Sequence, residues 1–222
     1  MSTAVKERTG LTGNQLKIIA MIAMTCDHVG LQLLPQFPLL RIIGRLSLPI
    51  YAYMIAEGCR YTRNRKAYLL RLASLAALCQ IVYFFAMGSL YQCILVTFTL
   101  SVCLIWLWDE KPGFRFYTAL AAVFILCRVV PDLLPNTDFR IDYGVWGVLL
   151  PWMVYVASTR GLTVGLLLLA FSYGGNQWWA LAAVPLLMLY NGQRGKWKIG
   201  KLFYFYYPAH LVIIYLLSLL LP

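Results

Sequence analysis

The chain has 222 residues, of which 61% are hydrophobic and only 12% are charged, whereas about a quarter of the residues of a soluble domain are charged. A chain with so few charges lacks the polar surface that a water-soluble globule needs, so the composition excludes an ordinary soluble domain. The formal net charge of +11 is no evidence for nucleic-acid binding, because that requires basic residues clustered on one exposed face.

The apolar residues come in successive runs of about 20, the length at which a helix crosses ~30 Å of hydrocarbon. Barrel strands would instead be alternating segments of about ten residues. The sequence therefore predicts an all-α fold, a polytopic transmembrane helix bundle of about nine spans, forming one domain over residues 1–222. The expected spans cover residues 15–34, 39–59, 68–87, 90–108, 116–134, 143–157, 162–190 as two short helices that part at Gly174, Gly175 and Asn176, and 202–221.

The charges of the loops predict a cytoplasmic N-terminus. With that end inside, the outer loops hold Arg140 alone, beside Asp132, Asp138 and Asp142. The cations of the inner loops are Lys6, Arg8, Arg60, Arg63, Arg65, Lys66, Lys111, Arg115, Arg160, Arg194, Lys196, Lys198 and Lys201. Such an asymmetry is typical of membrane proteins, and it requires residues 162–190 to cross the membrane an even number of times. Two short helices meet this requirement, and so does a re-entrant segment.

The sequence indicates no metal site. The six cysteines fall in apolar stretches without a close CxxC pair, as expected of small buried hydrophobes. Asp27, His28, Glu57 and His210 have no ligand spacing within one helix, such as HExxH.

Ionisable side chains at membrane depth are costly and mark functional sites by default. Asp27 and His28 lie in the first expected span, but neighbouring residues of a helix point about 100° apart, so the two are not expected to pair with each other. Arg41 and Arg45 lie four residues apart on one face of the second span, and one or the other is the expected partner of Asp27. A buried Asp–Arg pair can also be a purely structural tie between helices.

His210 lies in the last expected span, one turn after Tyr206 and Tyr207. Histidine is the side chain most easily poised as a base near neutral pH. A structural role, with the ring bonded to a backbone carbonyl or a tyrosine, stays open for His210.

The basic loop 60–66 at the inner side has two interpretations. It is a topology signal or a contact for anionic lipid, or it is a cradle for phosphate, whose oxygens match the forked donors of arginine.

Several ordered motifs resemble the TraX family, named for the membrane protein that acetylates the N-terminus of conjugative F-type pilin. The motifs are LTGNQLK (11–17), DHVG (27–30), LRIIGRLSLPI (40–50), EG (57–58), TRN (62–64), YLLRL (68–72) and YFYYPAHL (204–211). Leu48 stands where the family usually has an aromatic residue before the proline. The family is also thought to be distantly related to membrane acyltransferases that modify sugars and other polymers.

The resemblance implies an acetyltransferase in the bacterial inner membrane, which moves an acetyl group from cytoplasmic acetyl-CoA to an acceptor at the outer face. His28 would be the base or a transient acyl carrier, oriented with the help of Asp27, while Arg45 would stabilise the oxyanion or the thioester carbonyl. Tyr207 and His210 would line the channel and relay the proton. The residues expected to bind CoA are Arg41, Glu57, Arg63, Asn64, Arg65, Lys66 and Arg71.

Two other functions stay open at this point. Buried Asp, His and Arg also mark ion pathways, so a small proton-coupled or solute transporter is the alternative, and a structural assembly protein without chemistry is the third. The acceptor is an amine such as a pilin or peptide N-terminus, a sugar hydroxyl or a lipid headgroup.

Overall fold

The computed structural model describes residues 9–196 and 200–220, which form helices and two isolated β-bridges, with no strand among them. The loop cations Lys6, Arg8 and Lys198, the side chain of Lys201 and the end of the last expected span at residue 221 lie outside the described residues. Four helical segments are long and apolar enough to cross a membrane: Pro38–Tyr61, Arg65–Phe85, Phe114–Leu133 and Gly144–Tyr173. The predicted all-helical class is confirmed, whereas the count of nine spans is not.

The chain divides into two compact units, each of which is described by itself. The first comprises Met1–Tyr51 and Trp179–Pro222, and the second Ala52–Trp178. The single domain predicted over residues 1–222 stays a prediction.

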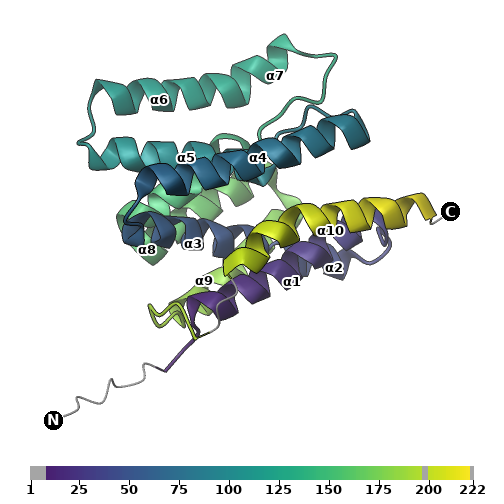
Figure 1. Cartoon of the computed structure of the whole chain (residues 1–222), viewed down its shortest axis with the longest axis horizontal. Helices are drawn as coiled ribbons and strands as arrows, with labels where there is room; N and C mark the ends of the chain where they lie inside the picture. Colours follow the sequence, from purple (N-terminus) through teal and green to yellow (C-terminus); the bar gives the residue numbers. More distant parts are fainter. Residues whose placement is uncertain (1–8, 197–199, 221–222) are drawn as a thin grey trace. The chain divides into compact units, whose positions relative to one another are not determined.

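The first unit is built around α1 (Gly13–Gln32) and α10 (Gly200–Leu220), which are drawn in purple and yellow in Figure 1. Thr25 and His28 of α1 contact Tyr206 and His210 of α10, respectively. Both residue numbers rise together, so the two helices run parallel. Their shared direction aligns the polar residues of the DHVG and YFYYPAHL motifs.

The beginning of α1 is closed by the loop 189–196, which precedes α10. Thr12 forms a capping box with Gln15, which satisfies two of the free donors of the first turn. The two backbone N–H groups between them, of Gly13 and Asn14, donate to the carbonyls of Gln193 and Arg194 in the loop at 2.8 and 3.0 Å. The loop is therefore fixed to the first turn of α1.

The second expected span, 39–59, is interrupted. It consists of α2 (Pro38–Gly44) and α3 (Ser47–Tyr61), the first turn of which belongs to the first unit. Pro49 explains the break, because a proline ring clashes with the carbonyl four residues earlier and removes one helical N–H. Two short α-helical pieces thus replace one continuous helix.

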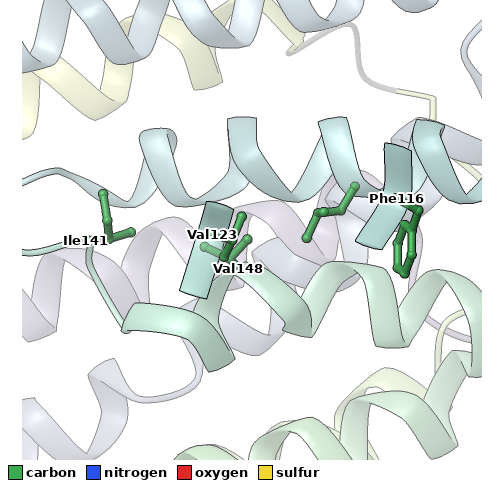
Figure 2. Packing of buried hydrophobic residues seen from close by; sticks show 5 residues of the cluster. Phe116, Val123, Ile141 and Val148 are labelled. Atoms are coloured by element: carbon green, nitrogen blue, oxygen red, sulfur yellow. The ribbon is translucent and has the colours of Figure 1, made fainter. Parts of the chain in front are cut away.

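The second unit contains α4 (Arg65–Met87), α5 (Ile94–Asp109), α6 (Phe114–Phe124), η1 (Ile125–Val129), α7 (Val130–Leu133) and α8 (Gly144–Tyr173). Its core is a cluster of buried residues, of which Phe116, Val123, Ile141 and Val148 are labelled in Figure 2. Hydroxyls join α5 to α8 inside this core, since Ser101 donates to the Val148 carbonyl at 2.7 Å. Such bonds between helices are common where water is absent.

Helix α8 is in fact two helices that fold back on each other at Ser158. The backbone of Ser158 has φ 51° and ψ −130°, outside the helical region. Cβ atoms placed on Gly161 and Gly165 would strike Met153 and Leu150, although 15 residues of unbroken helix would separate Leu150 from Gly165 by about 22 Å. The GxxxG at Gly161 and Gly165 therefore marks close contact between the two arms.

The arms agree with the expected span 143–157 and with a following helix from residue 162. The predicted break at Gly174, Gly175 and Asn176 is also present, since α8 ends at Tyr173. The segment after this break differs from a regular short helix, because η2 (Gly175–Ala182) is a 3-10 helix and α9 (Ala183–Met188) has only six residues.

The loops of the second unit gather at two opposite ends. At one end the loop 88–93 bonds to the loop 135–143 through the bridge between Gln92 and Ile141. Asp138 accepts from the Ser89 hydroxyl and the Leu90 N–H, and these bonds hold the pKa of Asp138 below its usual range. Asp138 and Asp142, two of the acids assigned to outer loops from the sequence, thus lie at the same end of this unit.

Ser158 gives a test of the hairpin. Positive φ costs a serine roughly 1–3 kcal/mol, which glycine avoids. We expect Ser158→Gly to keep or raise the thermal stability of the purified protein in detergent, and Ser158→Val to lower it. Ser158→Ala controls for loss of the hydroxyl. If the glycine and valine variants were equally stable, residue 158 would not have the positive φ described here.

Candidate active site

Asp27 faces α2, where two arginines hold its carboxylate. Nη1 of Arg41 lies 2.6 Å from Oδ2 of Asp27 and also donates to the Asp27 carbonyl oxygen at 3.1 Å. Nη2 of Arg45 donates to the other carboxylate oxygen, Oδ1. The predicted partnership of Asp27 with Arg41 and Arg45 is therefore confirmed, and it includes both arginines at once.

Two glycines allow α1 and α2 to approach closely enough for these bonds. A Cβ on Gly44 would fall on the Asp27 side chain, and one on Gly30 would lie 2.8 Å from Cβ of Leu40. Small residues at a helix contact let backbones come close and buried polar groups meet. The ion pair is accordingly shielded, with side-chain exposures of 15% for Asp27 and 12% for Arg45.

His28 points away from this ion pair and meets His210 of α10. Nδ1 of His28 lies 3.1 Å from Nε2 of His210, and the ring centroids are 5.0 Å apart. His210 is 5% exposed. The only two histidines of the chain thus form one pair, although 182 positions separate them in the sequence.

Aromatic rings and hydroxyls surround the His210 side of this pair. The Tyr206 ring stacks on His210 with centroids 5.2 Å apart, and the Tyr207 ring meets it edge-on at 5.5 Å. The hydroxyl of Tyr206 bonds to Oγ1 of Thr25, which itself donates to the Met21 carbonyl at 3.0 Å. Tyr206 is therefore the donor to Thr25, and α10 is tied to α1 next to the histidines.

The hydrogen bonds determine the tautomers of a neutral pair. Nδ1 of His210 lies 2.9 Å from the Tyr206 carbonyl oxygen, which can only accept, so this nitrogen carries the proton. Nε2 of His210 is then an acceptor and receives the proton of His28 Nδ1. The remaining nitrogen, Nε2 of His28, keeps its lone pair, which is what a general base or a nucleophile requires.

The charges around the site favour an anion. Asp27 is the one acidic residue among the described residues of the first unit, and it is shared by two guanidinium groups. The cluster thus has an excess positive charge where the side chains of Asp27 and Arg45 are largely buried, and uncompensated buried charge is costly. A negative charge developing nearby would be stabilised.

Several residues expected to bind CoA instead hold one another in the second unit. Glu57 pairs with Arg60 at 2.6 Å, and Arg60 donates to the carbonyls of Val154 and Tyr155 at 2.9 and 2.6 Å. Arg60 therefore caps the first arm of α8, where helix carbonyls attract a cation.

The start of α4 uses three more of these residues. Asn64 caps the helix by accepting from the Ala67 N–H at 2.9 Å, and Nε of Arg71 donates to the Ala67 carbonyl at 3.0 Å. Arg65 pairs with Asp109 at 2.5 Å, and Tyr155 also donates to Asp109, at 3.0 Å. These contacts give the residues structural roles.

Arg63 and Lys66 are different, because both are exposed and neither has a salt bridge among the described residues. They remain the best donors for an anion at the beginning of α4. The prediction that this loop binds CoA stays a prediction.

The first unit contains Asp27, His28, Arg45, Tyr207 and His210, the five residues predicted to be catalytic. Arg41 pairs with Asp27, and its expected contact with CoA stays a prediction. The sequence analysis did not single out Thr25, nor assign a role to Tyr206. Their helical spacing was the available signal, since Thr25 lies three residues before His28 and Tyr206 four before His210, and such residues share a face.

Comparison with known proteins agrees with the motifs. A family model described as TraX protein matches residues 12–218. The chain belongs to the TraX family. A probable fimbrial assembly protein, FimC of serogroup H1 from Dichelobacter nodosus, is 25% identical over 236 aligned positions that cover 90% of this chain and 93% of that protein.

A shorter match is to an uncharacterized protein of Rickettsia prowazekii (strain Madrid E), which is 50% identical over 38 residues, 17% of this chain and 15% of that protein. No solved structure matches the chain significantly. Membership of the family thus rests on a match that extends over nearly all of the chain.

The charge balance of the ion pair can be tested by stability. Asp27→Asn leaves two buried guanidinium groups without a counter-ion, so we expect a loss of about 3–5 kcal/mol. Arg41→Gln should cost much less, because Asp27 keeps Arg45 and the excess charge disappears. Thermal unfolding in one detergent compares the two variants with wild type.

Combining the two substitutions is the control. Arg41→Gln should partly restore the stability of the Asp27→Asn variant, since one of the two unpaired charges is removed. A double variant less stable than Asp27→Asn alone would show that the charge balance is not what the ion pair provides.

Proposed function

We propose that this TraX-family protein is a membrane-embedded acetyltransferase that moves an acetyl group from cytoplasmic acetyl-CoA to an amine or hydroxyl at the outer face. The observation that carries the proposal is the buried pair of His28 and His210 beside an Asp27 that is held by two arginines. The family and the fimbrial assembly relative make a pilin or peptide N-terminus the first acceptor to test.

In the proposed reaction His28 acts as the base. Its Nε2 takes a proton from the acceptor amine while the amine nitrogen bonds to the acetyl carbonyl carbon and the carbon–sulfur bond breaks. The proton then passes to the departing thiolate, so that the products are the acetylated amine and CoA. His210 shares the positive charge of the imidazolium through the bond from His28 Nδ1.

Arg45, and Arg41 beside it, would stabilise the carbonyl oxygen as it becomes negative. Asp27 orients these guanidinium groups rather than His28, and it is a positioning residue in this scheme. The Tyr207 ring against His210 would line the path of the acceptor. No step requires a metal, and the described residues hold no cluster of three metal-ligating side chains.

We further propose that the N-terminus is cytoplasmic, that the helices cross the bacterial inner membrane about nine times, and that the basic loop ends face the cytoplasm. The bridge between Leu11 and Tyr190 places these two residues side by side, and therefore on the same side of the membrane. This supports an even number of crossings by the chain between them. The two arms of α8 and the following η2 and α9 supply short crossings for this count.

Replacement of His28 tests the chemistry. We expect His28→Ala to lower acetyl transfer from labelled acetyl-CoA to a peptide with a free N-terminus by about 100-fold or more, the usual contribution of a general base. His210→Gln should give a smaller loss. Ile22→Ala, on the lipid-facing side of the same helix and 58% exposed in wild type, is the matched control and should retain activity.

The same peptide with a blocked N-terminus separates amine from hydroxyl acceptors. Full transfer by His28→Ala would overturn the assignment of the base. A folded wild type without CoA turnover, whose proton or solute flux in proteoliposomes is lost in His28→Ala, would favour the transporter, because buried His and Arg also form ion paths.

Labelling from outside tests the topology. We expect a membrane-impermeant maleimide to label Asn136→Cys and Asn176→Cys in intact cells, and Glu110→Cys only after permeabilisation. Positions 110 and 136 lie at opposite ends of the segment Phe114–Leu133, so equal labelling of the two would contradict a crossing there. Protection of position 176 would contradict the two short crossings on either side of it, one by the second arm of α8 and one by η2 with α9.

A further inference from the structure

A second basic cluster lies in the same unit as the histidines, at the beginning of α1. It consists of Lys17 and Arg194, and Lys196 follows Arg194 by two residues in the same loop. The backbone of Arg194 is fixed beside the first turn of α1 by the bond from the Asn14 N–H, and Asn14 lies one turn before Lys17. Nζ of Lys17 lies 5.4 Å from the ring centre of Phe203 in α10. The cluster thus spans the loop and the ends of both parallel helices.

Lys17 and Arg194 have no acidic counterpart among the described residues of this unit. The guanidinium group of Arg194 is close enough to Lys17 for the two charges to repel each other. Asp27, the one acidic residue that the structure describes here, lies about 15 Å further along α1 and is already bound by Arg41 and Arg45. Like charges held together without an acid are suited to an anionic ligand.

Side chains, and not the helix terminus, would meet that anion. The N–H groups of Gly13 and Asn14 already donate to the loop carbonyls, and that of Gln15 donates to Thr12. Lys17 and Arg194 therefore supply the free donors, and phosphate is the anion that such groups bind best.

The position of the cluster matches the length of the acyl donor. Lys17 and His28 are 11 residues apart on one helix, which is about 16 Å. The pantetheine arm of CoA has 12 bonds between its phosphate oxygen and its sulfur, equivalent to four extended residues or about 14 Å. A nucleotide end at Lys17 thus places the thioester at the level of His28.

We propose that Lys17 and Arg194, with Lys196, bind the phosphate groups of the donor CoA. This inference rests on the proposed acetyltransferase function. It moves the phosphate site from the loop 60–66, where Arg65 and Asn64 have structural partners, to the unit that holds His28. The phosphate of an anionic lipid headgroup is the other source of the same chemistry.

CoA binding by the full-length protein in nanodiscs of phosphatidylcholine, which carries no net charge, tests the site. We expect the double variant Lys17→Gln, Arg194→Gln to bind CoA at least about tenfold more weakly, a loss of roughly one charge-assisted contact. S-acetyl-pantetheine, which has no phosphate, should be used equally well by this variant and wild type. Lys17→Arg should restore CoA binding.

The loop 60–66 is the competing phosphate site, and it is tested in parallel with Arg63→Gln, Lys66→Gln. If the phosphates bind at Lys17 and Arg194, this variant binds CoA within about twofold of wild type. A tenfold loss there, with unchanged binding in the Lys17 and Arg194 variant, would overturn the site and leave the acetyltransferase intact. Wild type that binds no CoA at all would overturn both proposals.

Vesicle composition separates the two phosphate sources. If the Lys17 and Arg194 variant binds CoA like wild type but loses preference for phosphatidylglycerol over phosphatidylcholine, the cluster is a lipid site and the proposal fails. The melting temperature, measured in parallel, identifies a variant that has simply unfolded. If the double variant unfolds, Lys17→Gln and Arg194→Gln are tested separately.

Discussion

Inside a folded protein little water is available to satisfy a charge, so each buried ionised side chain needs a partner from the protein. The carboxylate of Asp27 is the counter-ion of both Arg41 and Arg45. These ion pairs can form because α1 and α2 approach closely at Gly30 and Gly44. The rest of the candidate site depends on this arrangement. Both carboxylate oxygens of Asp27 are bonded to Arg41 and Arg45, whereas the ring of His28 bonds to His210.

The 100° turn between neighbouring helix residues gives α1 two different polar faces. Asp27 lies on the face toward α2, and His28 lies on the face toward α10. The partner of His28 is consequently a second histidine, whose own tautomer is fixed by the Tyr206 carbonyl. This pair leaves a lone pair on His28 Nε2 and lies in the same unit as a cluster with excess positive charge, a combination that suits attack on a thioester better than binding of a cation.

The second unit uses its polar residues differently. Glu57 pairs with Arg60, which donates to the carbonyls at the end of the first α8 arm, and Arg65 pairs with Asp109. These contacts hold the hairpin at Ser158 in place. They also occupy guanidinium groups of Arg60 and Arg65 that could otherwise bind a ligand. Whether a charged loop binds a ligand thus depends on which of its charges are left over after the fold has been built.

The sequence by itself determined that the chain is a helical membrane protein, because its apolar runs are long and its charges few. It also determined the partners of Asp27, since Arg41 and Arg45 were the two cations on one face of the next span, and the family, through ordered motifs. The pairing of His28 with His210 was decided by tertiary structure alone, because nothing local links residues 182 positions apart. A turn after residue 157 was expected from the lengths of the apolar runs, but its tight form at Ser158 was decided by tertiary structure, since serine rarely adopts positive φ and Gly161 and Gly165 pack against the first arm.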